Sequence, residues 1–205
     1  MKRKRGSLLI IIGTLLIACA LCLTLYNYYR ENRAYAGADE AESEMAGLIP
    51  DRVNPVVTFD VGTIEDTSGS AVTIDESTVL INGIKYLGII ELPTANIKLP
   101  VCADFSYENM AVSPCRWQGT VAENDIVICG HNYRRHFGRL DNLGIGDTAT
   151  FTDADGYKYN YKVVGYEIIN GTDVEGMLSG DWDMTLFTCT MDGRSRITIR
   201  LDRTN

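Results

Sequence analysis

The sequence predicts a mainly β protein, a closed or nearly closed barrel of short strands carried on an N-terminal membrane helix. The first observation is a series of β-prone runs separated by turn signals, which is typical of barrels. These runs span residues 85–92, 97–101, 125–129, 147–151, 157–169, 184–190 and 196–201. The second observation is an uncharged segment, mainly Leu, Ile and Ala, at residues 8–25. Together they indicate one folded domain behind one anchor.

The N-terminal segment is long enough to cross a membrane. Eighteen or so apolar residues at about 1.5 Å each span most of a ~30 Å hydrocarbon core, and the tyrosines that follow suit the interface. Four cations at positions 2–5 precede the segment, which predicts a cytoplasmic N-terminus and an extracellular domain. The triplet Ala34-Tyr35-Ala36 favours a cleaved signal peptide instead, but charged residues separate it from an unusually long apolar run. Both interpretations export the domain.

Three parts follow from this organisation. Residues 1–30 form the cytoplasmic tip and transmembrane anchor, residues 31–78 an acidic extracellular linker, and residues 79–205 the folded domain. The middle part is rich in Ala, Gly, Ser, Asp and Glu, so it buries too little apolar surface to offset its ordering entropy. Its β-prone residues 53–61 either remain in the linker or dock on the domain as an edge strand or a lid.

Turn chemistry joins two of the predicted strands. Residues 152–156 read Thr-Asp-Ala-Asp-Gly, which predicts a hairpin between the runs on either side. Residues 107–117 and 135–143 are each predicted to hold a short helix. The domain is therefore expected to contain seven or eight strands and few helices.

The composition excludes several functions. The formal net charge is −8 and the pI about 4.8, so the cationic footprint that nucleic acid requires is missing. The six cysteines match no paired CxxC zinc pattern, and His131 and His136 are the two histidines in the chain. Cys102 and Cys115 either form a disulfide in the exported domain or remain buried thiols.

Three residues at the ends of predicted strands carry the candidate chemistry. His131 follows a buried-looking strand, Cys189 lies near the end of a β-prone run, and Arg196 starts the next run. Taken singly, the histidine is typical of a loop and the cysteine of a core. In combination they supply a base, a thiol nucleophile and a cation for an oxyanion.

Two other arginines compete with Arg196 for the third role. Arg196 and Arg200 share one face of an alternating strand, which fixes the direction of Arg196 at the start of that strand. Arg194 lies in the flexible loop beside Gly193. We therefore assign the role to Arg196.

The same stretches carry a family resemblance. In chain order they are Gly130-His131-Asn132, Phe137-Gly138-x-Leu140 with Leu143 and Gly146-Asp147, Thr185-Leu186-x-Thr188-Cys189-Thr190, and Arg196-Ile197-Thr198-Ile199. As a set, across residues 85–203, they resemble the motifs of sortases, the cysteine transpeptidases of Gram-positive bacterial surfaces. The resemblance implies an eight-stranded sortase barrel in which His131, Cys189 and Arg196 occupy the three catalytic positions.

The resemblance also implies a reaction and its partners. The Cys189 thiolate attacks the scissile threonine of an LPxTG-like C-terminal sorting signal, His131 protonates the departing amine, and Arg196 holds the substrate carbonyl. The partners implied are surface proteins with such signals and an amine acceptor on a peptidoglycan precursor or another protein. The enzyme is thus expected at the cell membrane, with its catalytic domain outside.

Substrate contacts are expected near the nucleophile and in the loop at residues 170–183. The candidates are Thr188, Thr190, Asn132, Val174, Met177 and Leu178. No cofactor is expected. Asp173 and Glu175, with Glu123 or Asp125, resemble the calcium site of some class A sortases, although surface acids are mostly solvated.

Alternative interpretations concern the subclass and the function. Residues 51–55 lack the lid aromatic of pilin-polymerising sortases, and the loop at residues 170–183 is short for the class B insertion. Both features favour an accessory or class D-like sortase. A cysteine peptidase or amidase acting on cell wall is the alternative enzyme, although papain-like versions place cysteine before histidine. The alternative outside enzymes is a membrane-anchored β-barrel binding module with a degenerate site.

Overall fold

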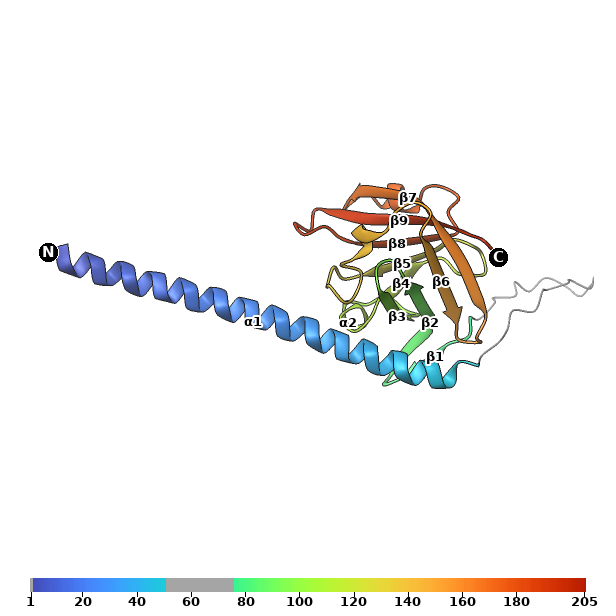
Figure 1. Cartoon of the computed structure of the whole chain (residues 1–205), viewed down its shortest axis with the longest axis horizontal. Helices are drawn as coiled ribbons and strands as arrows, with labels where there is room; N and C mark the ends of the chain where they lie inside the picture. The colour runs from blue at the N-terminus through green and yellow to red at the C-terminus, as the bar shows by residue number, and fades with distance from the viewer. Residues whose placement is uncertain (1, 51–75) are drawn as a thin grey trace, which may run out of the picture.

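One long helix precedes a closed barrel in the computed structural model, which describes residues 2–50 and 76–205 (Figure 1). The helix is α1 (Lys2–Leu48). The strands are β1 (Val79–Ile81), β2 (Ile84–Leu92), β3 (Ile97–Cys102), β4 (Cys115–Gln118), β5 (Ile126–Gly130), β6 (Thr148–Asp153), β7 (Lys158–Asn170), β8 (Met184–Cys189) and β9 (Ser195–Arg203). The short helices are α2 (Tyr107–Met110), η1 (Leu140–Asn142) and α3 (Val174–Leu178).

Eight strands close the barrel. They follow the order β2-β3-β4-β5-β8-β9-β7-β6, and the pairing of β6 with β2 completes the ring. The short β1 pairs with the first residues of β2, beside the stretch that β6 uses. β5 and β8 are parallel neighbours, whereas β8 and β9 are antiparallel. The predicted eight-stranded barrel behind an N-terminal apolar helix is confirmed.

Inward-facing apolar side chains fill the barrel. Ile90, Ile126, Ile128, Leu186 and Ile199 are each 0% exposed and belong to one continuous core. Every residue of β5 is buried, so the strand is packed on both faces and its position is fixed. Truncating such a side chain to Ala costs about 2–5 kcal/mol. This packing fixes the ends of β5 and β8, where the candidate chemistry lies.

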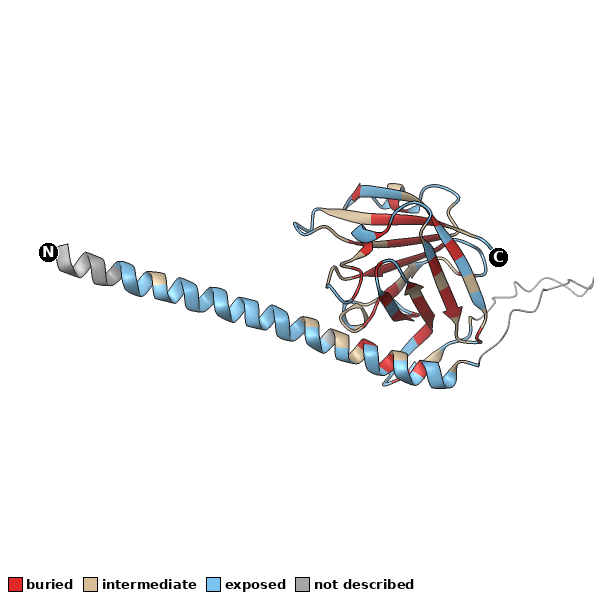
Figure 2. Cartoon of the chain, in the orientation of Figure 1, coloured by how far each residue is buried: buried red, intermediate tan, exposed pale blue. Residues whose placement is uncertain are grey.

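The C-terminal part of α1 packs against the barrel. Ala38, Ala41 and Met45 are 1%, 2% and 0% exposed, and their spacing of three and four residues puts them on one helix face. Figure 2 shows buried positions on α1 only where it meets the barrel. The structure therefore differs from the predicted extended linker over residues 31–48. Small apolar residues thinly spread in sequence form a continuous stripe once the chain is helical.

The N-terminal part of α1 projects away from the barrel as an exposed apolar helix. An 18-residue window within Leu9–Leu48 has a mean hydropathy of 2.6, and none of it is buried against the rest of the chain. Among the residues described, this is the one helix long and apolar enough to cross a membrane. Residues 51–55 and 53–61, considered above for a lid or an edge strand, lie outside the described residues.

A row of three thiols crosses neighbouring strands on the face that α1 and the β3–β4 connection cover. Cys102 pairs in register with Cys115, and Cys115 pairs with Cys129. All three are buried and all three are free thiols. They pack with Met45 and Tyr86 in a second apolar cluster outside the barrel interior. Of the two sequence interpretations for Cys102 and Cys115, buried thiols describe this structure.

Two segments predicted to be helical are only partly so. In residues 107–117, α2 takes a single turn capped by the Ser106 hydroxyl, and the chain then forms β4, which the sequence did not predict. β4 has only four residues and a mixed burial pattern, so it lacks a clear alternation. In residues 135–143 only η1 is helical. The hairpin between β6 and β7 forms as predicted, and the Asp153 carboxylate accepts bonds from the turn amides of Asp155 and Tyr157.

Candidate active site

The ends of three adjacent strands bring the three candidate residues together. Gly130 on β5 pairs with Thr188 on β8, so the next position on each strand puts His131 beside Cys189. Cys189 in turn pairs directly with Arg196 on β9. His131 precedes Cys189 by 58 positions and Arg196 by 65 positions in the sequence, yet the three residues lie side by side at one end of the barrel. Their order across the sheet puts the cysteine in the middle.

A groove of about 460 Å³ opens over these strand ends. His131, Cys189 and Arg196 all line it, and all three side chains are half-buried. Half-burial leaves each of them accessible to a ligand in the groove while the strand ends hold the backbone in place. The predicted contacts Val174 and Met177 line the groove as well.

Aromatic side chains that the sequence interpretation missed form much of the groove wall. They are Phe105 and Tyr107 from the β3–β4 connection, Trp117 from β4 and Phe187 from β8. The rings of Trp117 and Phe187 meet edge to face at 5.6 Å, as do those of Phe105 and Tyr107. Phe105 and Tyr107 remain 41% and 77% exposed, so they present apolar surface to a bound ligand. An exposed aromatic pair two residues apart was the only sequence signal for this wall.

Cys189 differs from the other thiols of the barrel in its surroundings. Cys102 and Cys129 are buried, and burial raises the pKa of Cys129 to about 12. The pKa of Cys102 is also raised, first by its hydrogen bond to Cys115 and then by burial. Thiols of this kind stay protonated and unreactive. Cys189 is only half-buried and lies between a histidine and an arginine.

The imidazole of His131 stacks on Tyr133, with ring centroids 4.6 Å apart and an interplanar angle of 27°. Burial lowers the pKa of His131, and the nearby Arg30 of α1 lowers it further. A lowered pKa means that the neutral imidazole predominates at pH 7. His131 is therefore suited to accept a proton, and the stacking fixes the plane of its ring.

Arg196 reaches the groove across the β8–β9 turn. Its Nη1 donates to the carbonyl oxygens of Gly193 at 3.1 Å and Ser195 at 3.0 Å. The guanidinium also passes close to Gly171, where a Cβ would lie 2.9 Å from Nη1. Because Gly171 has no side chain, it leaves room for the Arg196 guanidinium. Arg196 can exchange its loop carbonyls for a ligand oxygen without leaving the strand end.

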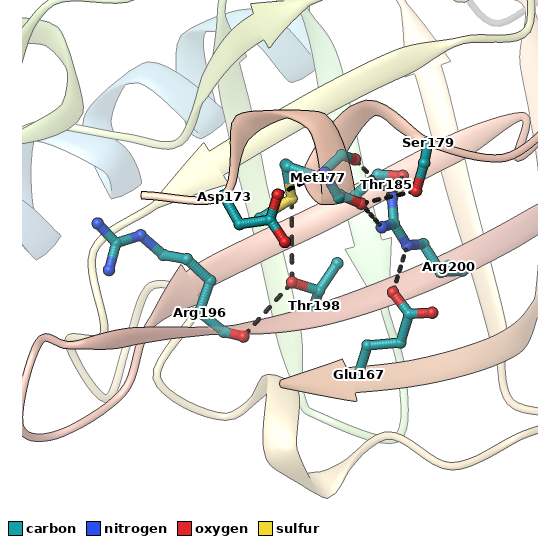
Figure 3. A network of polar contacts seen from close by, with 9 residues as sticks. Glu167, Asp173, Met177, Ser179, Thr185, Arg196, Thr198 and Arg200 are labelled. Carbon is teal, nitrogen blue, oxygen red and sulfur yellow. Dashed lines mark hydrogen bonds and ion pairs between the residues drawn. The ribbon is translucent and has the colours of Figure 1, made fainter. Parts of the chain in front are cut away.

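Arg200, four residues further along β9, is 1% exposed and has a structural role (Figure 3). Its guanidinium donates to the carbonyls of Met177 and Gly176, both at 2.7 Å, and to the Thr185 hydroxyl at 3.0 Å. It also pairs with Glu167 at 3.1 Å. These bonds tie α3 to the barrel, and α3 forms one side of the groove. In Figure 3 the Arg196 side chain points away from this network.

Three of the predicted contact residues organise strand ends and turns. The Thr188 hydroxyl donates to the Gly130 carbonyl at 2.8 Å, which ties β8 to β5 directly below His131. Thr190 sits in the β8–β9 turn, where its hydroxyl bonds to Asp192 at 2.6 Å. The Asn132 amide donates to the Thr190 carbonyl at 3.5 Å. Thr188 lines the floor of the groove, whereas Thr190, Asn132 and the predicted contact Leu178 are not part of its lining.

Two of the four acidic residues considered for calcium, Asp173 and Asp125, accept hydrogen bonds from backbone amides. Asp173 accepts a bond from the Gly176 amide at 2.8 Å and caps α3. Asp125 accepts one from the Thr120 amide at 2.8 Å. Within residues 2–50 and 76–205, no three His, Cys, Asp or Glu side chains converge on a position for a metal ion. A carboxylate that caps a helix has a structural use without a metal.

Comparison with known protein families identifies the domain. A sequence model of the sortase domain matches residues 90–203, more than half of the chain, and the match contains every residue discussed above for the strand-end site. The chain belongs to the sortase family. Membership supports a sortase-type cysteine transpeptidase in general terms, and with it a place at the cell surface.

Solved sortase structures share the fold. Sortase C1 from Streptococcus agalactiae is 26% identical with a TM-score of 0.55, covering 63% of this chain and 73% of that one. Sortase C from Clostridium perfringens SM101 is 26% identical with a TM-score of 0.51, covering 58% and 70%. A sortase D5 transpeptidase from C. perfringens shares the fold at 18% identity, with a TM-score of 0.54 and coverage of 62% and 83%. A search of curated protein sequences found no significant match.

Proposed function

We propose that this chain is a membrane-anchored transpeptidase that cleaves an LPxTG-like sorting signal and transfers the protein to an amine. The observation that carries the proposal is the strand-end register, in which Cys189 lies between His131 and Arg196 at the floor of an open groove. A related structure, sortase C from C. perfringens, has been solved with a C-terminal cell wall sorting motif. That relative supports the same class of substrate for this chain.

The first half-reaction forms a thioacyl-enzyme. The Cys189 thiolate attacks the carbonyl carbon of the scissile threonine, and the resulting tetrahedral intermediate collapses with loss of the glycine amine. His131, as imidazolium, donates the proton that this leaving amine needs. The peptide C–N bond breaks and a C–S bond replaces it, so the bond energy of the peptide is kept in a thioester.

The second half-reaction releases the product. An incoming amine attacks the thioester carbonyl while neutral His131 accepts its proton, and Cys189 leaves as the thiolate. Arg196 holds the substrate carbonyl in both halves and, with backbone N–H groups near Cys189, stabilises the oxyanion. For this, its guanidinium exchanges the Gly193 and Ser195 carbonyls for the substrate oxygen.

The protonation state of His131 limits the rate of the first half-reaction. That step needs the imidazolium, and burial lowers the pKa of His131, so this form is scarce at pH 7. The proposal therefore includes slow turnover.

The groove fits an apolar sorting motif. Val174, Met177, Trp117 and Phe187 all line the groove and offer apolar contact to a leucine-proline dipeptide. The proposal includes an extracellular groove, which is supported by the apolar segment of α1 and the four cations that precede it. The acceptor is the amine of a peptidoglycan precursor or of another protein.

One experiment tests the function. The full chain in detergent is mixed with a library of LPxTG-like peptides and an amine acceptor, and products are identified by mass spectrometry. We expect cleavage between Thr and Gly and a new amide bond to the acceptor, both lost in His131→Ala and Cys189→Ala. Full transfer by both variants would refute the proposed enzymatic role of this site. A wild-type chain that binds cell wall and reacts with none of the peptides would instead identify a binding module.

A further inference from the structure

The active-site end of the barrel faces the N-terminal, apolar half of α1. In Figure 1 the connection between β8 and β9, which begins directly after Cys189, points toward the end of the molecule that holds the N-terminus. His131 lies close enough to Arg30 on α1 for the arginine to lower its pKa. The candidate site therefore sits beside residue 30 of the helix, near the end of the apolar segment.

Helix geometry places this level at the membrane surface. Residues 8–25 span about 27 Å, which is close to the hydrocarbon thickness of a bilayer. Arg30 follows about 7 Å later, and the headgroup layer of one leaflet is about 5–7 Å thick. If the apolar segment fills the bilayer, Arg30 and the groove beside it lie at the outer edge of the headgroups.

Two contacts fix the β5–β6 connection to α1 at the same level. The backbone amide of Arg134 donates to the Glu31 carboxylate at 3.0 Å. The Arg135 guanidinium lies over the Tyr35 ring, 3.8 Å from its centroid. Both contacts lie within six residues of Arg30 along the helix, so the connection that starts at His131 cannot be far from the lipid.

Positive charge gathers at this level although the chain as a whole is acidic. We define the arginine collar as Arg30, Arg33, Arg134 and Arg135, from α1 and the start of the β5–β6 connection. All four are exposed. Glu31 is the one acidic residue in residues 30–35 and 131–135, so the cations of these two stretches outnumber the acids by four to one.

We infer that the arginine collar binds the headgroups of anionic phospholipids and seats the groove directly on the outer leaflet. The inference rests on the proposed placement of α1 across the membrane. Arginine forms paired hydrogen bonds with phosphate, and a basic side chain near an anionic surface shifts the docking equilibrium about five-fold. The consequence is a groove that receives substrates anchored in the same leaflet without a long flexible tether.

Hydrogen–deuterium exchange of the full chain in lipid nanodiscs tests this surface. One sample contains phosphatidylcholine alone and the other includes phosphatidylglycerol. We expect residues 131–139 to exchange several-fold more slowly with phosphatidylglycerol, and salt to remove the difference because it screens the headgroup charge. Equal exchange of residues 131–139 in both lipids at low salt would overturn the inference.

Charge variants separate the collar from a general electrostatic effect. Arg33→Gln with Arg134→Gln is expected to abolish the lipid dependence. Lys158→Gln with Lys162→Gln removes the same charge from β7, where the strand pairs with the end of β9 away from the groove, and should preserve it. If both double variants lose the lipid dependence equally, the collar is not the binding surface. The wild-type salt dependence stands as the test if the collar variant does not fold.

Failure of the anchor is distinguishable from failure of the collar. Flotation of the full chain with phosphatidylcholine vesicles measures insertion independently of headgroup charge. A chain that does not float refutes the membrane placement and the collar with it. A chain that floats, transfers peptide and shows lipid-independent exchange refutes the collar alone.

Discussion

The groove and the packed parts of the barrel carry the same three residue types in contrasting environments. In the groove, the half-buried members of each type are His131, Cys189 and Arg196. In the packed parts, His136, Cys115 and Arg200 are each exposed by 1% or less. The barrel thus contains its own control for each residue proposed to do chemistry.

The difference shows that access and partners, more than residue type, decide what a side chain can do. The Arg200 guanidinium is fixed because it donates hydrogen bonds to two carbonyls of α3 and to the Thr185 hydroxyl. Burial lowers the pKa of His136 to about 4, so this histidine stays neutral at pH 7. His131, Cys189 and Arg196 instead lie at strand ends, where the backbone is rigid and the side chain is accessible from the groove.

The cysteine pair gives the largest expected contrast. Cys189→Ala removes the nucleophile and should reduce peptide transfer by roughly 10⁴-fold or more. Cys115→Ala removes a packed sulfur and should cost about 1–2 kcal/mol of stability while transfer per folded molecule is kept. Chromatographic transfer assays and urea unfolding of the detergent-solubilised chain measure the two effects. Loss of transfer in Cys115→Ala at unchanged stability would break the contrast.

His131 is expected to give the next largest loss. His131→Ala should lower kcat/KM by about 10²–10⁴-fold, because both half-reactions need its proton transfer. Stability should change little, since the ring is half-buried and stacks on the half-buried Tyr133. A loss of less than about ten-fold would remove His131 from the proposed mechanism.

The three arginines near Cys189 sharpen the comparison further. Arg196→Ala should reduce transfer by about 10²–10³-fold through loss of oxyanion stabilisation. Arg200→Ala should act on folding, at about 3 kcal/mol or more, because it leaves the Thr185 hydroxyl and two carbonyls of α3 without their donor. Arg194→Ala is the matched control and should leave both peptide transfer and stability unchanged. Turnover lost in Arg194→Ala and spared in Arg196→Ala would show that the wrong arginine was assigned.

The buried histidine predicts a pH dependence of stability. His136 has a folded pKa of about 4 and an unfolded value near 6.5, so above pH 6.5 it is neutral in both states. As pH falls from 6.5 towards 4, only the unfolded chain takes up the proton, and stability is lost by up to about 3 kcal/mol. Urea unfolding at several pH values measures this. His136→Gln should flatten the dependence, and an unchanged slope in that variant would assign it to other groups.

The barrel could be predicted because its long strands carry strong patterns. The predicted runs at residues 97–101 and 184–190 differ from β3 and β8 by one residue at one end. The four-residue β4 and the three-residue β1 were missed, since so few residues give no period to recognise. The helical extension of α1 was missed for another reason. Its buried face consists of small residues, which add little hydrophobicity to an acidic stretch.

The candidate site was predictable where its residues share one motif and less so where they come from several segments. Cys189 and Arg196 are neighbours through one turn, and His131 joins them through the β5–β8 pairing. Phe105 and Tyr107 reach the groove from the β3–β4 connection, a contact that only the folded barrel creates. Thr188 was expected to touch substrate, but its hydroxyl is engaged by the Gly130 carbonyl. Local sequence does not reveal such a bond between two strands.

Mass spectrometry of the intact chain after brief reaction with a sorting peptide, without an amine acceptor, tests the central claim most directly. We predict an added mass equal to the peptide portion up to threonine, located on Cys189 by fragmentation and lost when an amine is added. The row of buried thiols in the same chain serves as the internal control. An adduct on Cys129, or one that persists in Cys189→Ala, would contradict the claim that the cysteine at the end of β8 is the nucleophile.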